Sequence, residues 1–294
     1  MMSEKTAPAK ITAKPKKYSA LNGDKPKWWY YLVAVVVILI FLLPVYVLLN
    51  ISFRTIQDIG SKLALPQTWT LANYTEVFTR GDIWVGFKNS VIYTLETVVV
   101  EILFSAMAAY GLARSSGKLA EAIRGVNMGI MMIPTVALLV GTYSLMASLH
   151  MTNTLWGLAL LTAAGSIPAT LFMYVNFVVA IPKALDEAAA IDGAGVLRTF
   201  FCIIMPQLKA VTVTRIIMSA VWSWNNYLMP MFLLQNQSKF TVILVIKSAF
   251  NATNGLGNLP LACATCVVGL LPVILLYLFL QKYIIEGQID SSVK

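Results

Sequence analysis

The chain contains six apolar runs, each about 20 residues long or longer and each with few charges. An α-helix rises about 1.5 Å per residue, so about 20 apolar residues cross the roughly 30 Å hydrocarbon core of a bilayer. The runs are continuous, whereas a membrane β-barrel needs alternating segments of about 10 residues. The pattern therefore predicts an all-α integral membrane protein. The six predicted spans are residues 30–49, 90–113, 125–149, 154–181, 211–234 and 259–280.

A shortage of charge supports the membrane assignment. The chain is 58% apolar and 12% charged, whereas a soluble domain carries about 25% charged residues. That composition leaves too little polar surface to coat a soluble globule of this size. Five spans also contain a proline, which a membrane bundle tolerates because neighbouring groups satisfy the freed carbonyls. These prolines are Pro44, Pro134, Pro168, Pro230 and Pro272.

Basic residues predict the orientation of the chain. Seven lysines lie in residues 1–28, a tail predicted to be disordered and cytoplasmic. With this tail inside, sixteen of the 22 lysines and arginines lie on the inner side, as the positive-inside rule requires. The first apolar run is too long for a signal-peptide core and is expected to remain as a span. Residues 29–284 then form a six-span domain with both termini cytoplasmic, and residues 285–294 form a C-terminal tail. The net charge of +9 is assigned to topology, and no nucleic-acid partner is expected.

Catalytic motifs are missing from the sequence. It contains no G-x-S-x-G, no H-E-x-x-H and no phosphate-binding loop; Gly117-Lys118, the nearest match to such a loop, continues with leucine. His150 is the only histidine. Cys263 and Cys266 form a C-A-T-C run, which suits either a redox or metal pair or two small residues of a lipid-embedded helix. The second interpretation is favoured because no further ligands lie nearby. The chain is predicted to be non-catalytic, with no metal site.

A polar segment, residues 182–206, separates the fourth and fifth spans on the predicted cytoplasmic side. Residues 183–191 are strong helix formers. Gly193 is a good helix stop because glycine adopts the left-handed conformation at little cost. Residues 196–205 predict a second short helix, broken near Pro206. The segment is therefore predicted to be a helix, a tight turn and a second helix.

The first of these short helices is lined by alanines. Ala188, Ala189 and Ala190 project little, so a groove of another protein could approach the backbone closely. Glu187 and Asp192 could anchor such a helix through charge-assisted hydrogen bonds. The alternative is an amphipathic surface helix that only connects two spans.

These residues carry a resemblance. The run E-A-A-x-x-D-G-A, from Glu187 to Ala194, resembles the EAA loop of ABC importer permeases. The hydrophobic layout resembles the six-span sugar permeases of the maltose-transporter type over almost the whole chain. Trp222–Pro230 and Gln281–Gly287 are similar to stretches of the same permeases. The EAA pattern is the more specific signal, because it combines residue order, spacing and position between two spans.

The resemblance implies a type I permease architecture in a bacterial cell membrane. Such a permease pairs with a second permease subunit, and the pair works with two ATP-binding subunits and an extracytoplasmic solute-binding protein. ATP and Mg²⁺ then belong to the ATPase subunits, and this chain holds no cofactor. The loop would dock in a groove of one ATPase subunit. The residues implied in this coupling are Glu187, Ala188, Ala189, Asp192, Gly193, Gly195 and Pro206.

Candidate residues of the solute pathway lie in the second and fifth spans. Asparagine donates and accepts hydrogen bonds, and aromatic rings offer flat faces to sugar rings. The alternative for the fifth span is contact between helices and anchoring at the interface. Two carboxylates in the second span are costly in a bilayer and indicate either solute contact or a structural partner. The candidates are Glu96, Glu101, Trp224, Asn225, Asn226 and Tyr227.

Other functions remain open at this level. The carboxylates of Glu96 or Glu101 could carry protons in a secondary transporter, although such a carrier has no ATPase to grip. A permease for a solute other than a sugar is a second alternative, and a membrane enzyme lacks any catalytic constellation. The long outer loop, residues 51–89, is expected to fold against the bundle or to contact an outside partner. Its aromatic residues are Trp69, Tyr74, Phe78 and Trp84.

Overall fold

The structure is a computed structural model that describes residues 28–251 and 258–292. The chain divides into two compact units, at residues 1–46 and 47–294. Most of α1 (Trp28–Ser52) lies in the first unit as an apolar helix with exposed side chains and with Pro44 inside it. The predicted disorder of the basic tail falls on residues outside the described part, apart from Trp28.

The described residues of the second unit form helices joined by loops, and the only β-type pairing among them is an isolated bridge between Arg54 and Trp69. The predicted all-α class is therefore confirmed. Its α-helices are α2 (Ala72–Arg80), α3 (Asp82–Arg114), α4 (Lys118–Met131), α5 (Leu139–Ser148), α6 (Leu155–Ala180), α7 (Ala184–Ile191), α8 (Val196–Thr199), α9 (Met205–Gln207), α10 (Lys209–Asn225), α11 (Leu228–Leu233), α12 (Val242–Asn251) and α13 (Leu259–Ser292). Shorter helical turns are η1 (Thr135–Leu138), η2 (Phe200–Ile204) and η3 (Gln237–Lys239).

Three of the described helices, α1, α3 and α6, are long and apolar enough to cross a membrane. They match the first, second and fourth predicted spans. Helix α6 begins where predicted because the Thr154 hydroxyl accepts a hydrogen bond from the N–H of Gly157 at 3.1 Å and so caps the helix. Helix α3 begins at Asp82, earlier than predicted, directly after Gly81 in the left-handed conformation (φ 79°).

The third predicted span is not one continuous helix. Helix α4 and the following helical segment Thr135–Ser148 meet at 91°. Pro134 lies at this break, where its missing N–H and its ring prevent an α-helix from continuing, and the residue before it is driven out of the helical region. Pro134 therefore lies between two helical segments rather than inside one continuous helix.

The fifth and sixth predicted spans also differ in detail. Helix α10 ends at Asn225, Asn226 is extended (ψ 118°), and α11 restarts at Leu228. Pro230 lies in this short restart rather than inside a long helix. Helix α13 continues to Ser292, so most of the predicted C-terminal tail, residues 285–294, is helical.

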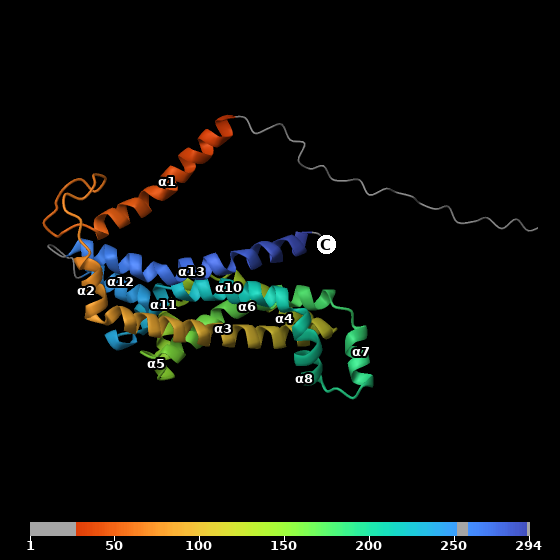
Figure 1. Cartoon of the computed structure of the whole chain (residues 1–294). Helices are drawn as coiled ribbons and strands as arrows, with labels where there is room; N and C mark the ends of the chain where they lie inside the picture. Colours follow the sequence, from red (N-terminus) through yellow and green to blue (C-terminus); the bar gives the residue numbers. More distant parts are fainter. Residues whose placement is uncertain (1–27, 252–257, 293–294) are drawn as a thin grey trace, which may run out of the picture. The chain divides into compact units, whose positions relative to one another are not determined.

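Helices α3, α6 and α10 lie side by side and form the centre of the second unit (Figure 1). Small side chains permit this close packing. Ala106 and Ala109 of α3, and Ala159 and Ala163 of α6, are completely buried. Figure 1 also places α2 and α12 at one end of this unit and α7 and α8 at the other.

Candidate functional site

The polar segment between the fourth and fifth predicted spans folds as a hairpin of two short helices, α7 and α8. The turn contains Gly193, whose φ of 76° is the left-handed conformation that glycine adopts readily. The N–H groups of Gly193 and Ala194 donate to the carbonyls of Ala190 and Ala189 and close the end of α7. The predicted helix, turn and second helix are therefore confirmed. Gly195 is extended and directly precedes α8.

The tip of the hairpin is exposed and mixes charge with apolar surface. Glu187 and Asp192 are both exposed, as is Ala188. Ile191, the last residue of α7, is 87% exposed, and Val196 at the start of α8 is also exposed. Apolar side chains that are surrounded by acids and stand clear of the bundle are typical of a surface that another protein covers.

One predicted coupling residue faces the wrong way for contact with a partner. Ala189 is only 3% exposed. Consecutive residues of an α-helix are about 100° apart, so Ala188, Ala189 and Ala190 cannot share one face. The sequence suggested one face made of three alanines. In the structure Ala188 and Ala190 are exposed, and Ala189 packs toward the rest of the chain.

The second helix of the hairpin does not break at Pro206. It runs through a π-helical turn, η2, and continues as α9 to Gln207, and the 81° bend follows at Leu208. In η2 the N–H of Met205 donates to the carbonyl of Phe200, five residues back. A wider turn before proline relieves the clash between its ring and the carbonyl four residues back. Pro206 itself is exposed.

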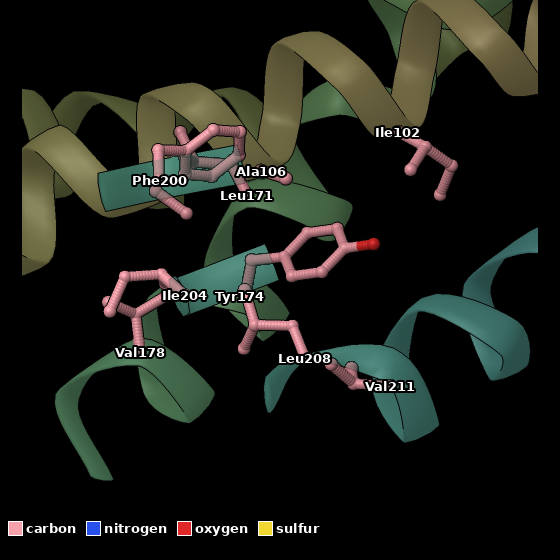
Figure 2. Close-up of a cluster of buried hydrophobic side chains, with 10 residues drawn as sticks. Ile102, Ala106, Leu171, Tyr174, Val178, Phe200, Ile204, Leu208 and Val211 are labelled. Atoms are coloured by element: carbon pink, nitrogen blue, oxygen red, sulfur yellow. The ribbon is translucent and has the colours of Figure 1, made fainter. Parts of the chain in front are cut away.

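Apolar side chains hold this second helix to the bundle. Phe200, Ile204 and Leu208 are almost completely buried. They join a cluster with Tyr174 and Val178 of α6 and with side chains of α3 (Figure 2). The end of the hairpin that leads into α10 is therefore fixed to the bundle by hydrophobic burial. Such burial stabilises the fold by about 1.5–3 kcal/mol for each large side chain.

The other end of the hairpin, at the start of α7, is held by polar contacts that the sequence did not predict. Asp186 of α7 accepts a hydrogen bond from the Tyr110 hydroxyl at 2.6 Å. It also pairs with Arg114 at 2.8 Å between Oδ2 and Nη2. Both partners lie in the last turns of α3. The available signal was the position of Asp186 directly before Glu187, because neighbouring acids on a helix must face different directions.

The buried carboxylate of Glu101 has partners within the chain. Its oxygens accept hydrogen bonds from Thr170 of α6 at 2.5 Å and from Ser219 of α10 at 2.6 Å. Arg215 of α10 forms an ion pair with the same carboxylate. Glu101 is completely buried, so its charge is compensated inside the bundle rather than by water. The missed signal was Arg215, a basic residue within the fifth predicted span, which had been counted only toward orientation.

Glu96 is set apart from this network. It lies five residues before Glu101, about 140° away around α3. Glu96 is half-buried, and its Oε2 has no hydrogen-bond partner among the described residues. The two glutamates, which the sequence presents as similar candidates, thus lie in different surroundings.

The candidates near the end of α10 point in several directions. Trp224 lines an apolar cavity of about 300 Å³ with Phe87, Pro272 and other side chains. Asn225 is exposed and donates to the carbonyl of Val221 in its own helix at 2.9 Å. Trp224 therefore lies beside an apolar cavity, whereas the Asn225 amide lies at the exposed surface.

Asn226 and Tyr227 occupy the break between α10 and α11. The Asn226 amide donates to the Tyr93 hydroxyl of α3 at 3.0 Å, and that hydroxyl also bonds to Thr162 of α6 at 2.9 Å. The Tyr227 ring is partly exposed and lies under the Lys247 ammonium, 5.3 Å from the ring centroid. Both residues are thus held by neighbours at the break.

The loop of residues 51–89, which the sequence predicts to lie outside, is held in shape by polar contacts of its own. Arg54 is buried and donates to the carbonyls of Gly60 and Ser61, and it pairs with Asp58 at 3.4 Å. Hydrogen bonds from the N–H groups of Gln67 and Gly60 hold the pKa of Asp58 below its ordinary value of 3.8.

The aromatic residues of this loop differ in their exposure. The Tyr74 hydroxyl is hydrogen-bonded to Ser52 at 2.7 Å. Trp69, Phe78 and Trp84 remain exposed.

No group of three or more histidine, cysteine or acidic side chains that could hold a metal occurs in the part of the chain that the structure describes. Cys263 and Cys266 are free, and Cys263 is buried. Cys266 packs against an apolar cluster that contains Val268.

Residues 101–288 match the family described as "Binding-protein-dependent transport system inner membrane component". The "Melibiose/raffinose/stachyose import permease protein MelC" of Bacillus subtilis is 37% identical over 86% of this chain and 91% of the relative. The "Multiple sugar-binding transport system permease protein MsmG" of Streptococcus mutans is 33% identical over 87% and 92%. The "Arabinooligosaccharides transport system permease protein AraQ" of Bacillus subtilis is 30% identical over 87% and 91%.

Solved structures share the fold. A chain of "a bacterial ABC transporter involved in the import of the acidic polysaccharide alginate" matches with a TM-score of 0.75 at 20% identity, over 87% of this chain and 95% of that chain. A chain of the alginate transporter in complex with an alginate pentasaccharide-bound periplasmic protein matches with a TM-score of 0.62 at 14% identity, over 86% and 92%.

Proposed function

The chain belongs to the family of binding-protein-dependent transport system inner membrane components, and from this premise we propose that it is a permease subunit of an ATP-driven oligosaccharide importer. It forms half of the pathway through the membrane. The relatives named above are named for the transport of sugars or oligosaccharides, which supports a short oligosaccharide as the solute.

The observation that carries the proposal is the hairpin of α7 and α8. Its tip is exposed and carries Glu187, Asp192 and Ile191, while both of its ends are fixed to the bundle. A connecting loop with no partner would gain by burying Ile191. An exposed tip on a fixed base instead suits a joint that inserts into a groove of a separate ATPase subunit.

Six spans and cytoplasmic termini are part of the proposal. The spans are α1, α3, the bent pair of α4 and α5, α6, α10 with α11, and α13. The hairpin then lies on the cytoplasmic side, and the loop with α2 lies outside. This arrangement agrees with the distribution of lysines and arginines.

The proposed assembly has a second permease subunit, two ATP-binding subunits and a solute-binding protein on the outer side of a bacterial cell membrane. ATP and Mg²⁺ are held by the ATP-binding subunits, and this chain binds no cofactor. The coupling residues are Glu187, Ala188, Asp192, Gly193 and Gly195, with the buried Ala189 packing α7 and the exposed Pro206 lying just before the bend at Leu208.

Solute contact is proposed for the break after α10, where Asn225 and Tyr227 are exposed. Asn226 holds the break against α3, and Trp224 supplies an aromatic wall. Glu101 contributes through its contacts with α6 and α10 rather than through solute. Glu96 remains a candidate for direct contact because one of its oxygens has no partner among the described residues.

A proton-coupled carrier is the competing function. It loses support because the chain belongs to a binding-protein-dependent family. Glu101 is also engaged in an ion pair with Arg215 inside the bundle, which gives its carboxylate a structural partner. A carrier would purify without an ATPase, which separates the two functions directly.

The test is a charge reversal at the hairpin tip. The complete importer is reconstituted in lipid nanodiscs with its binding protein, and ATP hydrolysis is measured with raffinose and with an arabinooligosaccharide. Glu187→Lys is expected to leave the chain folded in the membrane and to abolish solute-stimulated hydrolysis. Glu121→Lys is the matched control, because Glu121 is an exposed acid in the first turn of α4.

Two outcomes would contradict the proposal. If no ATPase subunit co-purifies with the wild-type chain, the importer assignment fails. If Glu187→Lys keeps full stimulated hydrolysis, the hairpin tip is not the coupling joint.

A further inference from the structure

The two acids at the start of α7 serve different surfaces. Glu187 is exposed, whereas Asp186 is half-buried and contacts α3. Neighbouring residues of a helix are about 100° apart, so one short helix presents a carboxylate to each side. The outward acid belongs to the proposed joint, and the inward acid has no role in that proposal.

The inward carboxylate contacts α3, and its partner Arg114 extends the link to α6. Tyr110 donates to its Oδ1 at 2.6 Å, and Arg114 pairs with its Oδ2 at 2.8 Å. The other terminal nitrogen of Arg114 donates to the carbonyl of Val178 at 3.2 Å, near the C-terminal end of α6. A cation at that end also suits the negative end of the α6 dipole. We name Asp186, Tyr110 and Arg114 the α7 clamp.

Helix α7 has little else to hold it to α3. Its single buried side chain is that of Ala189, which is small. The other end of the hairpin, by contrast, buries the large side chains of Phe200 and Ile204. The α7 clamp is therefore the main side-chain attachment of this helix.

Helix α3 leads from the α7 clamp to the middle of the bundle. Tyr110 lies nine residues after Glu101, about 14 Å along the helix. Glu101 contacts Arg215 and Ser219 of α10. Because α3 is an unbroken helix from Asp82 to Arg114, a displacement at one end is carried along it.

We propose that Asp186 is a positioning residue that fixes α7 to the inner end of α3, so that motion imposed on the hairpin is transmitted through α3 to α10. The inference rests on the proposed function, since it assigns the path by which the joint acts on the pathway. Glu187 meets the ATPase subunit, and Asp186 carries the motion inward.

The experiment measures whether α7 and α3 move as one body. Nitroxide labels are placed at Ile191→Cys and Met107→Cys, after replacement of Cys202, Cys263 and Cys266 by alanine. Distances between the labels are measured by electron spin resonance in the reconstituted importer, without nucleotide and with a non-hydrolysable ATP analogue. The distance is expected to stay constant in the parent protein and to change or broaden with the analogue in Asp186→Asn.

A functional arm accompanies the distances. Asp186→Asn is expected to keep the ATPase subunits bound and to lower raffinose uptake per ATP hydrolysed by about tenfold, the loss of one charge-assisted hydrogen bond. Tyr110→Phe is expected to give a smaller fall, because the ion pair remains. Exchange of the charges in Asp186→Arg with Arg114→Asp is expected to restore part of the coupling, because the ion pair can re-form with its charges exchanged. Glu121→Gln is the control and is expected to behave as the parent.

The outcomes separate this inference from the proposed function. An unchanged distance and normal coupling in Asp186→Asn, with ATPase subunits bound, overturn the role of the α7 clamp alone. Loss of the ATPase subunits from Asp186→Asn also overturns it, because the residue would then act in assembly. Absence of ATPase subunits from the wild-type preparation overturns the proposed function instead.

Discussion

Two polar groups that involve α3 each pair an acid with an arginine and differ in their surroundings. The Glu101 group in the middle of the bundle combines an acid, an arginine and two hydroxyls, and its acid is completely buried. The α7 clamp at the end of α3 combines an acid, an arginine and a phenol, and its charged side chains keep 16–20% of their surface exposed.

The two groups differ in how much hydration their charged side chains lose on folding. A buried ion pair loses its hydration, so removal of one partner leaves an uncompensated charge and is strongly destabilising. A pair that water still reaches is weaker and is easier to re-form after it opens. The Glu101 group thus suits a permanent link between helices, and the α7 clamp suits a joint under changing load.

The largest expected effect is at the buried group. Glu101→Ala leaves Arg215 without its partner inside the bundle and is expected to lower the free energy of unfolding by about 3–5 kcal/mol. Equilibrium unfolding by SDS in mixed micelles measures the change. A loss no greater than that of a surface variant such as Glu121→Gln would contradict the comparison.

The same group offers a sharper test. Glu101→Gln combined with Arg215→Met removes both charges and keeps similar volumes. Most of the stability lost in Glu101→Ala is expected to return, because replacement of a buried pair by uncharged groups is often neutral. If the double variant is as unstable as Glu101→Ala in the same SDS titration, the unpaired charge is not the cause.

The α7 clamp is expected to matter less for stability than for coupling. Asp186→Asn is expected to lower the free energy of unfolding by about 1 kcal/mol, since water screens the remaining arginine. The SDS titration measures this loss beside the distance experiment. A loss as large as that of Glu101→Ala would make the α7 clamp a structural link and remove the contrast.

The smallest effect is expected at an uncharged group further along α3. Tyr93 bonds to Thr162 of α6 and to Asn226 at the break after α10. Thr162→Val removes the first of these bonds and is expected to lower the free energy of unfolding by about 0.6 kcal/mol, the average found for a hydrogen bond between membrane helices. A loss above that of Asp186→Asn in the same SDS titration would reverse the proposed order.

Local features were predictable from the sequence. The helical segments follow from continuous apolar runs, and the hairpin turn follows from Gly193, because hydropathy and left-handed backbone are properties of a short stretch. The resemblance carried by Glu187 to Ala194 and by the overall layout led to the family that the comparisons confirm. The roles of individual site residues remain predictions.

Only the tertiary structure decided which distant side chains meet. Arg215 lies 114 residues after Glu101, and Asp186 lies 76 residues after Tyr110. Such pairs depend on how helices cross and which face each presents, and a single sequence does not contain that geometry in any local pattern. The same holds for proline, which is accommodated inside α6 at Pro168 but lies at a 91° break at Pro134. Local chemistry sets where a helix can bend, and packing determines whether it does.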